Sequence, residues 1–189
     1  MKWLTGRGAA AALAVGAATV WGLGWRGFVV LLAFLVSGSV LTEGGGRRNA
    51  RQVLANGGVA AVAGLLGHWI AFAGAIAAAT SDTWSSEIGR RSRALPRLVT
   101  SWKEVPAGTD GGMTVLGTLG GLLGAAFIGA VTYALGHREW LVLTTAGVAG
   151  MVLDSLLGAS VQGKVRWMDN DAVNLAATLT GAVCAGLLA

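Results

Sequence analysis

Long apolar runs separated by short polar segments occupy the chain from beginning to end. A membrane-spanning helix needs about 20 mostly apolar residues, and most of these runs approach that length. They predict an all-α, polytopic integral membrane helix bundle, with residues 1–189 as a single transmembrane domain. We expect about seven transmembrane helices. Six is the alternative, because the third and fourth runs form either one bent unit or two tight helices. The runs are 8–25, 27–42, 52–66, 68–86, 112–136, 139–161 and 172–189.

The composition agrees with a membrane protein. Hydrophobic residues make up 54% of the chain and charged residues only 12%, whereas soluble domains carry about 25% charged residues. The 31 glycines favour closely packed helices, because small residues let helix backbones approach one another within a membrane.

The basic residues orient the predicted bundle. With seven spans and a cytoplasmic N-terminus, twelve of the 14 Lys and Arg residues face one side, and only Arg26 and Arg138 face the other. Such a bias marks the cytoplasmic face, so we expect a protein of the cytoplasmic (inner) membrane. The twelve are Lys2, Arg7, Arg47, Arg48, Arg51, Arg90, Arg91, Arg93, Arg97, Lys103, Lys164 and Arg166.

Two interpretations of this basic surface stay open. Topology and attraction to anionic membrane lipids explain it without a ligand, and a bound polyphosphate explains it equally well. We expect no nucleic acid as a partner, because no aromatic stacking platform accompanies the arginines.

An amide face is predicted where the third span enters the membrane. In RRNARQVLANGG, a helix would place Asn49, Gln52 and Asn56 on one side. Hydrogen bonding between helices is one interpretation of such a face, and phosphate binding is the other.

The stretch SDTWSSEIG, at the end of the fourth run, holds two acids. A carboxylate inside a span costs roughly 2.5–3.5 kcal/mol on insertion scales, so a functional role is the default hypothesis. Asp82 shares its helical face with Ser86. Glu87 lies nearer the loop, where pairing with Arg90 or Arg91 is the alternative interpretation.

The stretch PAGTDGG predicts a glycine-rich turn directly before a helix. Backbone amides of such a turn, followed by a helix N-terminus, form an anion site. An ordinary loop in which Asp110 caps the next helix is the alternative. No GxxxxGK[ST] motif is present, so the turn is not a P-loop.

The last two runs carry further polar residues. Asp154 lies on a helical stripe with Gly147, Gly150 and Gly158, so we expect it to point into the bundle. No lysine or arginine lies inside any span, so a metal ion or a ligand must supply the counter-charge. Asn174 shares a face of the last helix with other polar residues.

These groups suit a divalent cation and phosphates. Carboxylates, amides and hydroxyls without a His/Cys cluster favour Mg²⁺, and we predict Asp82 and Asp154 as its ligands. Arginines bind phosphates bidentately. The basic residues nearest the polar segments, which we assign to nucleotide phosphates, are Arg47, Arg51, Arg97, Lys103 and Lys164.

Five motifs together resemble a known family. RNARQVLANGG, SDTWSSEIG, PRLVTSWKEVPAGTDGG, LDSLLGASVQG and DAVNLAATLTGA, in order over roughly 45–185, are similar to the membrane family of unknown function 92, the transmembrane protein 19-like proteins. That family includes the plant phytyl phosphate kinase of vitamin E synthesis. It is distantly similar to CTP-using dolichol kinases and phosphatidate cytidylyltransferases.

The resemblance implies an enzyme that phosphorylates a prenyl (phytyl or geranylgeranyl) monophosphate to the diphosphate, with CTP as co-substrate and Mg²⁺. Catalysis would take place at the cytoplasmic membrane face, with Asp82, Glu87 and Asp154 as catalytic residues. Asp110 departs from the family pattern, which has a small or amide residue there, and is not assigned. The matching motif positions are Asp82, Glu87, Gly108, Thr109, Gly111, Gly112, Asp154 and Asn174.

Two rival functions stay open. One is a membrane cytidylyltransferase acting on a lipid phosphate, and the other is a transporter or flippase for such a lipid. A transporter places its polar groups near mid-membrane, whereas here they crowd one face. We expect a prenyl phosphate lipid, a nucleotide and membrane lipids as partners, and the sequence leaves a homodimer open.

Overall fold

The protein is an all-helical bundle in the computed structural model, which describes residues 4–42 and 47–189. The predicted placement of Lys2 lies outside these residues. The all-α prediction is confirmed, and two short strands follow the third helix. The elements are α1 (Gly6–Leu41), α2 (Ala50–Leu65), α3 (Trp69–Gly89), β1 (Arg97–Leu98), β2 (Gly112–Met113), α4 (Val115–Ala134), α5 (Trp140–Ser160) and α6 (Asn170–Leu188).

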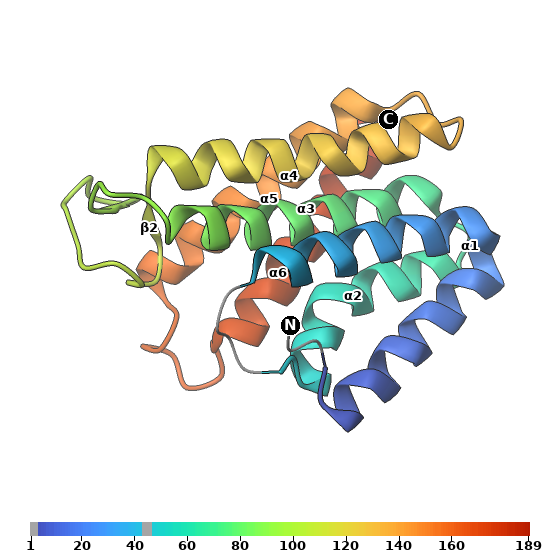
Figure 1. The fold of residues 1–189 in the computed structure, drawn as a ribbon, viewed down its shortest axis with the longest axis horizontal. Coiled ribbons are helices and arrows are strands. Elements are labelled where there is room, and N and C mark those ends of the chain that lie inside the picture. Colours follow the sequence, from blue (N-terminus) through green and yellow to red (C-terminus); the bar gives the residue numbers. More distant parts are fainter. Residues whose placement is uncertain (1–3, 43–46) are drawn as a thin grey trace.

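The first helix is sharply kinked. Gly24 has φ 64° and ψ −159°, a conformation that glycine adopts without steric cost, and the two arms of α1 diverge from it (Figure 1). The arms correspond to the first two predicted runs. The stretch 52–86 forms two helices, α2 and α3, joined at Gly67, which also has a positive φ of 72°.

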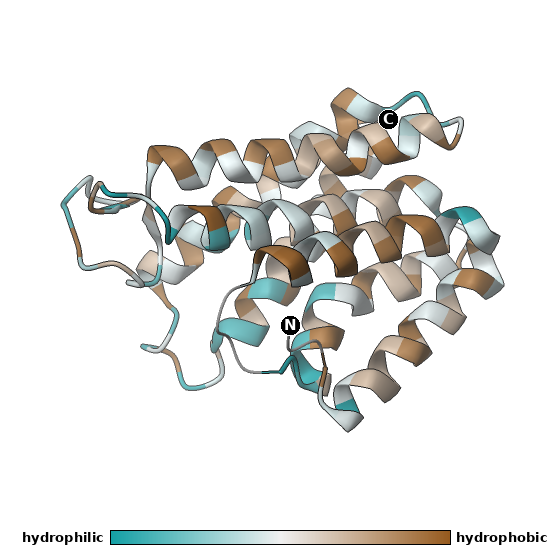
Figure 2. Ribbon diagram, in the orientation of Figure 1, coloured by the Kyte–Doolittle hydropathy of each residue, from teal (hydrophilic) through white to brown (hydrophobic). Residues whose placement is uncertain are grey.

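Within the part of the chain that the structure describes, four helices, α1, α4, α5 and α6, are long and apolar enough to cross a membrane. Large apolar side chains such as Leu13, Val115 and Leu187, which are 74%, 80% and 81% exposed, lie on their outer faces. The ribbon in Figure 2 is coloured by hydropathy and shows apolar residues along the length of the helices. Soluble monomers rarely expose contiguous apolar patches of this kind, so lipid is the expected solvent. The count of seven spans stays a prediction.

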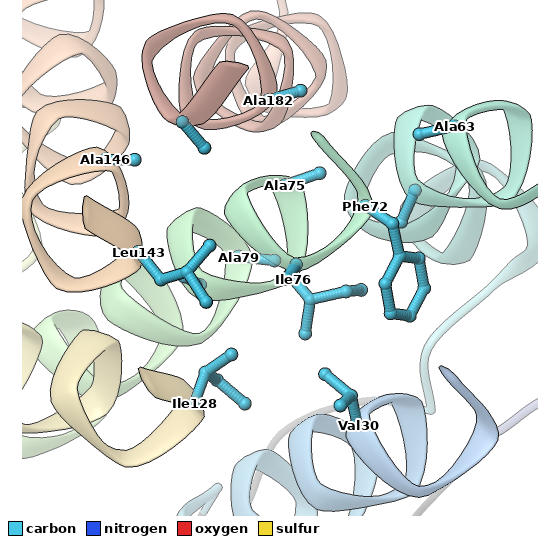
Figure 3. Close-up of a cluster of buried hydrophobic side chains, with 14 of the residues drawn as sticks. Val30, Ala63, Phe72, Ala75, Ile76, Ala79, Ile128, Leu143, Ala146 and Ala182 are labelled. Atoms are coloured by element: carbon cyan, nitrogen blue, oxygen red, sulfur yellow. The ribbon is translucent and has the colours of Figure 1, made fainter. Parts of the chain in front are cut away.

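Helix α3 lies at the centre and packs against all five other helices. Its residues 72–81 are all buried, and most of them are alanine or glycine, which lets the neighbouring backbones come close. The larger side chains Phe72 and Ile76 meet Val30, Ile128 and Leu143 in the core (Figure 3).

The polar segments gather at one end of the bundle, which we call the polar end: residues 47–52, 90–114 and 161–171 (Figures 1 and 2). The N-terminal segment joins them, because the backbone N–H of Thr5 donates to the carbonyl of Arg48 at 3.0 Å. Side chains cap the helices that begin at this end, and α3 and α5, which begin at the other end, have no such cap. The capping residues are Thr5, Asn49, Thr114 and Asp169.

The opposite end holds the two basic residues that we predicted to face away. Arg26 follows the kink of α1, and Arg138 lies between α4 and α5. Burial lowers the pKa of the neighbouring His137, and the charge of Arg26 lowers it further, so Arg26 lies near this connection. The separation of charge along the bundle therefore agrees with the predicted topology. Which end faces the cytoplasm stays a prediction.

Close contact between α3 and α6 generates the first testable prediction. A Cβ added at Gly181 would meet the carbonyl oxygen of Gly74 and, at 2.6 Å, the Cβ of Ala78. Gly181→Ala should therefore destabilise the protein by about 1–3 kcal/mol, as overpacking generally does. Gly186→Ala on the same helix is the matched control, because no atom lies within 4 Å of its added Cβ. Thermal unfolding in detergent measures both, and equal melting temperatures would contradict the close α3–α6 packing.

Candidate functional site

A cavity of about 440 Å³ opens at the polar end, within the range of about 300–1,000 Å³ typical of ligand pockets. Five segments form its wall: the start of α2, the last turns of α3, the loop 90–114, the end of α5 and the start of α6. Most of the lining is polar or glycine. It comprises Thr42, Arg48, Gln52, Asp82, Thr83, Ser85, Ser86, Glu87, Gly89, Arg90, Ser92, Ala94, Pro96, Ala107, Gly108, Thr109, Asp110, Gly111, Gly112, Met113, Thr114, Gly117, Asp154, Ser155, Gln162, Asn170 and Asn174.

Two acids from different helices meet in this cavity. The carboxyl groups of Asp82 on α3 and Asp154 on α5 lie within hydrogen-bonding reach of each other. Oδ2 of Asp154 is buried and has no hydrogen-bond partner among the described residues. Neither acid forms an ion pair within the described part of the chain, although the charge of Arg90 attracts Asp82 from further away. The pair therefore lacks a counter-charge of its own.

The glycine stripe of α5 explains why the acids meet. A Cβ added at Gly150 would lie 2.5 Å from the Cβ of Ala78, and one at Gly147 would lie 3.0 Å from the Cβ of Ala77. Because α5 presses this face against α3, Asp154, one turn beyond Gly150, comes to lie beside Asp82. The prediction that Asp154 points into the bundle is confirmed by this packing.

Glu87 lines the cavity and forms an ion pair. Its two carboxylate oxygens accept hydrogen bonds from Nη1 of Arg90 at 3.0 and 3.1 Å, and its side chain is only 11% exposed. The structure therefore shows the pairing that we gave as the alternative interpretation. Arg91 points elsewhere and donates to the carbonyl of Leu41 at 3.2 Å.

The glycine-rich turn forms one wall of the cavity. Gly108 and Gly111 have positive φ angles of 87° and 73°, and the turn closes onto the antiparallel pair β1–β2, with Leu98 opposite Gly112. Gly111 is pressed against α5, because an added Cβ would lie 2.5 Å from the carbonyl oxygen of Ser155. This contact holds the turn beside the acid pair.

The helix after the turn begins later than predicted. Helix α4 starts at Val115, and the hydroxyl of Thr114 accepts a hydrogen bond from the N–H of Gly117 at 2.9 Å. Thr114 is therefore the cap, and the interpretation that Asp110 caps this helix is wrong. Asp110 instead lines the cavity, and its charge acts on Asp154.

The start of α6 completes the cavity. Thr178 donates to the carbonyl of Ala55 on α2 at 3.1 Å, and Gly181 meets Gly74 on α3. The face shared by these residues thus packs inward, and it places Asn174, one turn earlier, in the cavity wall.

The structure brings ten of the predicted site residues together in the cavity wall and places seven outside it. Their functional roles stay predictions. The ten are Gln52, Asp82, Ser86, Glu87, Gly108, Thr109, Gly111, Gly112, Asp154 and Asn174, and the seven are Arg47, Asn49, Arg51, Asn56, Arg97, Lys103 and Lys164.

Five of the seven residues outside the cavity wall form polar contacts within the protein. Asn49 caps α2 in a reciprocal pair with Gln52, and Asn56 donates to the carbonyl of Gln52 at 3.0 Å. Arg97 pairs with Glu104 at 2.7 Å. The remaining two, Arg47 and Lys103, are exposed side chains.

Arg51 and Lys164 join segments of the polar end. Arg51 pairs with Asp169 at 2.7 Å. The N–H of Ala172 and this arginine hold the pKa of Asp169 below its usual range. Lys164 donates to the carbonyls of Ala159 and Ser160 at 3.0 and 2.9 Å, at the end of α5. These contacts fix the start of α6 and the end of α5.

Sequence reasoning missed Arg48 as a site residue. Its guanidinium lies 5.6 Å from the ring centroid of Phe34 and forms no hydrogen bond or ion pair with any described residue. Burial lowers the pKa of Arg48, while the charge of Glu87 raises it. The only signal in the sequence is its place next to the amide motif, which it shares with Arg47. Other missed lining residues include Arg90, Ser155, Gln162 and Asn170.

Comparison with known proteins identifies the family. The family described as Integral membrane protein DUF92 matches residues 1–182. The chain belongs to this family. The resemblance found in its motifs is therefore confirmed, and the protein is an integral membrane protein.

Three relatives of this DUF92 protein cover most of it. Uncharacterized membrane protein MJ0933 of Methanocaldococcus jannaschii is 38% identical over 87% of this chain and 77% of its own length. Protein VTE6, chloroplastic, of Arabidopsis thaliana is 31% identical over 98% of this chain and 65% of its own length. Protein PGR of the same plant is 30% identical over 74% of this chain and 65% of its own length. The chain thus spans about two thirds of the two plant proteins. No solved structure matches it.

Oδ2 of Asp154, which is buried without a hydrogen-bond partner among the described residues, leads to a prediction about stability. Asp154→Asn should stabilise this DUF92 protein in the absence of divalent cations, because it removes one of two facing carboxylates and supplies an amide N–H that can donate to Asp82. The gain should be about 1–3 kcal/mol, the cost of leaving a buried polar group without a partner. Thermal unfolding in EDTA measures the change. Glu104→Gln is the control, because its exposed pair with Arg97 contributes at most about 1 kcal/mol. A larger loss of stability in Asp154→Asn than in the control would mean that the carboxylate is neutralised within the protein.

Proposed function

We propose that this protein is a CTP-dependent prenyl monophosphate kinase that works at the cytoplasmic face of the inner membrane. The observation that carries the proposal is the Asp82–Asp154 pair, which forms no ion pair among the described residues and faces a cavity large enough for nucleotide phosphates. Arg48, whose guanidinium forms no hydrogen bond or ion pair with any described residue, lies in the same cavity.

The acid pair fits Mg²⁺. This ion is usually bound through one or two carboxylates together with substrate phosphates, and no group of three or more His, Cys, Asp or Glu side chains suited to a metal occurs in the described residues. Asp82 and Asp154 would hold the ion. When bound, Mg²⁺ neutralises charge on the phosphates during transfer.

The reaction needs little covalent help from the protein. An oxygen of the prenyl monophosphate attacks the γ-phosphorus of CTP, and the bond from that phosphorus to the β–γ bridging oxygen breaks. The products are the prenyl diphosphate and CDP. The attacking phosphate, with a second pKa near 6, is mostly ionised at neutral pH, so no general base is required. Positioning and charge neutralisation dominate such transfers.

The remaining cavity residues supply that positioning. The backbone of the turn from Gly108 to Gly112 faces the cavity beside the acid pair, as phosphate-binding turns do. We assign the phosphate-binding cations to Arg48 and Arg90, because both line the cavity, whereas Arg51, Arg97 and Lys164 lie outside it.

The family supports the same chemistry. Two of the motifs that resemble the family, which includes the plant phytyl phosphate kinase, are SDTWSSEIG, which holds Asp82, and LDSLLGASVQG, which holds Asp154. Protein VTE6 is similar over nearly the whole chain.

Product analysis tests the proposal. Purified protein in lipid nanodiscs, supplied with CTP, phytyl phosphate and Mg²⁺, should release CDP and form phytyl diphosphate. Release of pyrophosphate with a CMP–lipid product would instead show a cytidylyltransferase. Movement of phytyl phosphate between leaflets of a vesicle, without any product, would show a transporter.

The acid that binds the metal should be indispensable. Asp82→Asn keeps the shape of the side chain and removes the charge that holds Mg²⁺. Turnover should fall at least about a hundredfold, the scale of losing one contact that stabilises the transition state. Glu87→Gln should lose less, because its carboxylate mainly positions Arg90. Turnover and melting temperature are measured over a range of Mg²⁺, with Glu104→Gln as the control. Near-normal turnover with lowered stability would make Asp82 a structural residue.

A further inference from the structure

A second cavity, smaller and mostly apolar, lies between the two arms of α1 and the first turns of α2. Its volume is about 90 Å³, and its wall includes Ala12, Gly16, Phe28 and Leu32 from the arms, with Val53 from α2. We call it the tail groove. In Figure 1 the arms diverge from the kink at Gly24, with α2 beside them.

The tail groove adjoins the polar cavity. Arg48 and Gln52 line both of them, so a ligand that extends from one to the other passes these two side chains. Gly38 makes room for the arginine, because a Cβ at that position would lie 2.9 Å from Nη2 of Arg48. A partly buried guanidinium that forms no hydrogen bond or ion pair with residues 4–42 or 47–189 therefore lies where an apolar groove meets a polar cavity.

We propose that the tail groove binds the isoprenoid chain of a prenyl phosphate and that Arg48 binds the phosphate of the same molecule. This inference rests on the proposed function and deepens it, because it assigns the lipid tail to a groove outside the polar cavity and gives Arg48 to the lipid phosphate, which leaves Arg90 for the nucleotide. The phosphate held by Arg48 would project into the polar cavity, toward the acid pair.

The size of the groove favours a single chain over a diacyl lipid. At about 90 Å³ it is well below the roughly 300–1,000 Å³ of pockets that enclose a drug-sized ligand. It therefore accommodates one section of a single chain, and the rest of that chain lies in the surrounding lipid. The small residues Ala12 and Gly16 in its wall keep the groove open on the side of the first arm.

The charge of Arg48 also indicates how the lipid is oriented, with its phosphate end at the junction of the two cavities. A guanidinium offers five N–H donors in a planar fork that matches a phosphate, and those of Arg48 are not used by the described protein. Phe34 lies 5.6 Å from the group, and Arg48 lines both cavities, so a phosphate at their junction is within its reach. A neutral lipid would leave the N–H donors of Arg48 without an acceptor.

Binding of phytyl phosphate, without nucleotide or Mg²⁺, tests the proposal. The protein is placed in neutral phosphatidylcholine nanodiscs, and the affinity for labelled phytyl phosphate is measured. Ala12→Leu should weaken binding at least about tenfold, because the larger side chain fills the groove. Ala14→Leu is the matched control on the same helix. Its position is exposed and outside the groove, so the affinity should change less than about twofold. Geranyl phosphate, which has a shorter chain, should lose less affinity in Ala12→Leu.

The role of Arg48 is separated with a second probe. Arg48→Gln should weaken binding of phytyl phosphate at least about tenfold and leave binding of phytol, which lacks the phosphate, unchanged. Equal losses for the two probes, or equal effects of Ala12→Leu and Ala14→Leu, would overturn the proposal. Displacement of phytyl phosphate by phosphatidate as effectively as by unlabelled phytyl phosphate would also overturn it, because the groove would then be a general phospholipid site.

A crosslinking experiment on the unaltered protein tests the proposal without requiring that any variant folds. A prenyl phosphate with a diazirine on its tail should label peptides from 12–16, 28–35 and 53–57, and labelling confined to the outer face of α4 would overturn the proposal. The two proposals can fail separately. If phytyl phosphate binds as expected but no diphosphate forms, only the proposed kinase activity is contradicted. Conversely, turnover by Ala12→Leu equal to that of the unaltered protein would contradict only the groove.

Discussion

Two acids pressed together inside the bundle are the constraint on which the rest of the structure depends. Helices α3 and α5 meet through glycine and alanine, and this contact leaves Asp82 and Asp154 within hydrogen-bonding reach. Two like charges 4 Å apart repel by about 4 kcal/mol at an effective dielectric constant of 20. The arrangement is therefore stable only with a shared proton or a bound cation.

The surrounding elements form two different cavities, one of which holds this pair. The loop 90–114 and the starts of α2 and α6 form a polar cavity that opens toward water. The kink at Gly24 separates the arms of α1 and leaves the tail groove beside α2. Arg48 lies where the two meet. A water-soluble nucleotide and a membrane-embedded lipid would therefore approach the acids from opposite directions, as phosphoryl transfer between them requires.

The local sequence patterns, namely the apolar runs and the glycine stripe of α5, predicted the helices and the acid pair well. Apolar runs marked the helices, because lipid requires long uninterrupted stretches of hydrogen-bonded backbone. The glycine stripe of α5 predicted that Asp154 points inward, since only a closely packed face needs glycine at each turn. The cap of α4 was less predictable, because Thr114 and Asp110 are both good capping residues and only the backbone path of the turn decides between them.

The sequence alone could not distinguish the basic residues that line the cavities from those that are exposed or paired elsewhere. Arg47 and Arg48 are neighbours with the same chemistry, yet one is exposed and the other faces two cavities. Arg51 is adjacent to the amide motif, but its partner Asp169 lies 118 positions further along the chain. Such long-range pairings depend on how the helices assemble, which no local pattern records.

Binding of Mn²⁺, a paramagnetic substitute for Mg²⁺, tests the central claim that the two acids hold one divalent cation. Electron paramagnetic resonance is recorded on the purified protein with a non-hydrolysable CTP analogue. The account predicts one tightly bound Mn²⁺ per chain, lost in both Asp82→Asn and Asp154→Asn and retained in Glu104→Gln, with ³¹P couplings from the nucleotide. Equal Mn²⁺ binding by all four proteins, or none by the unaltered protein, would contradict it.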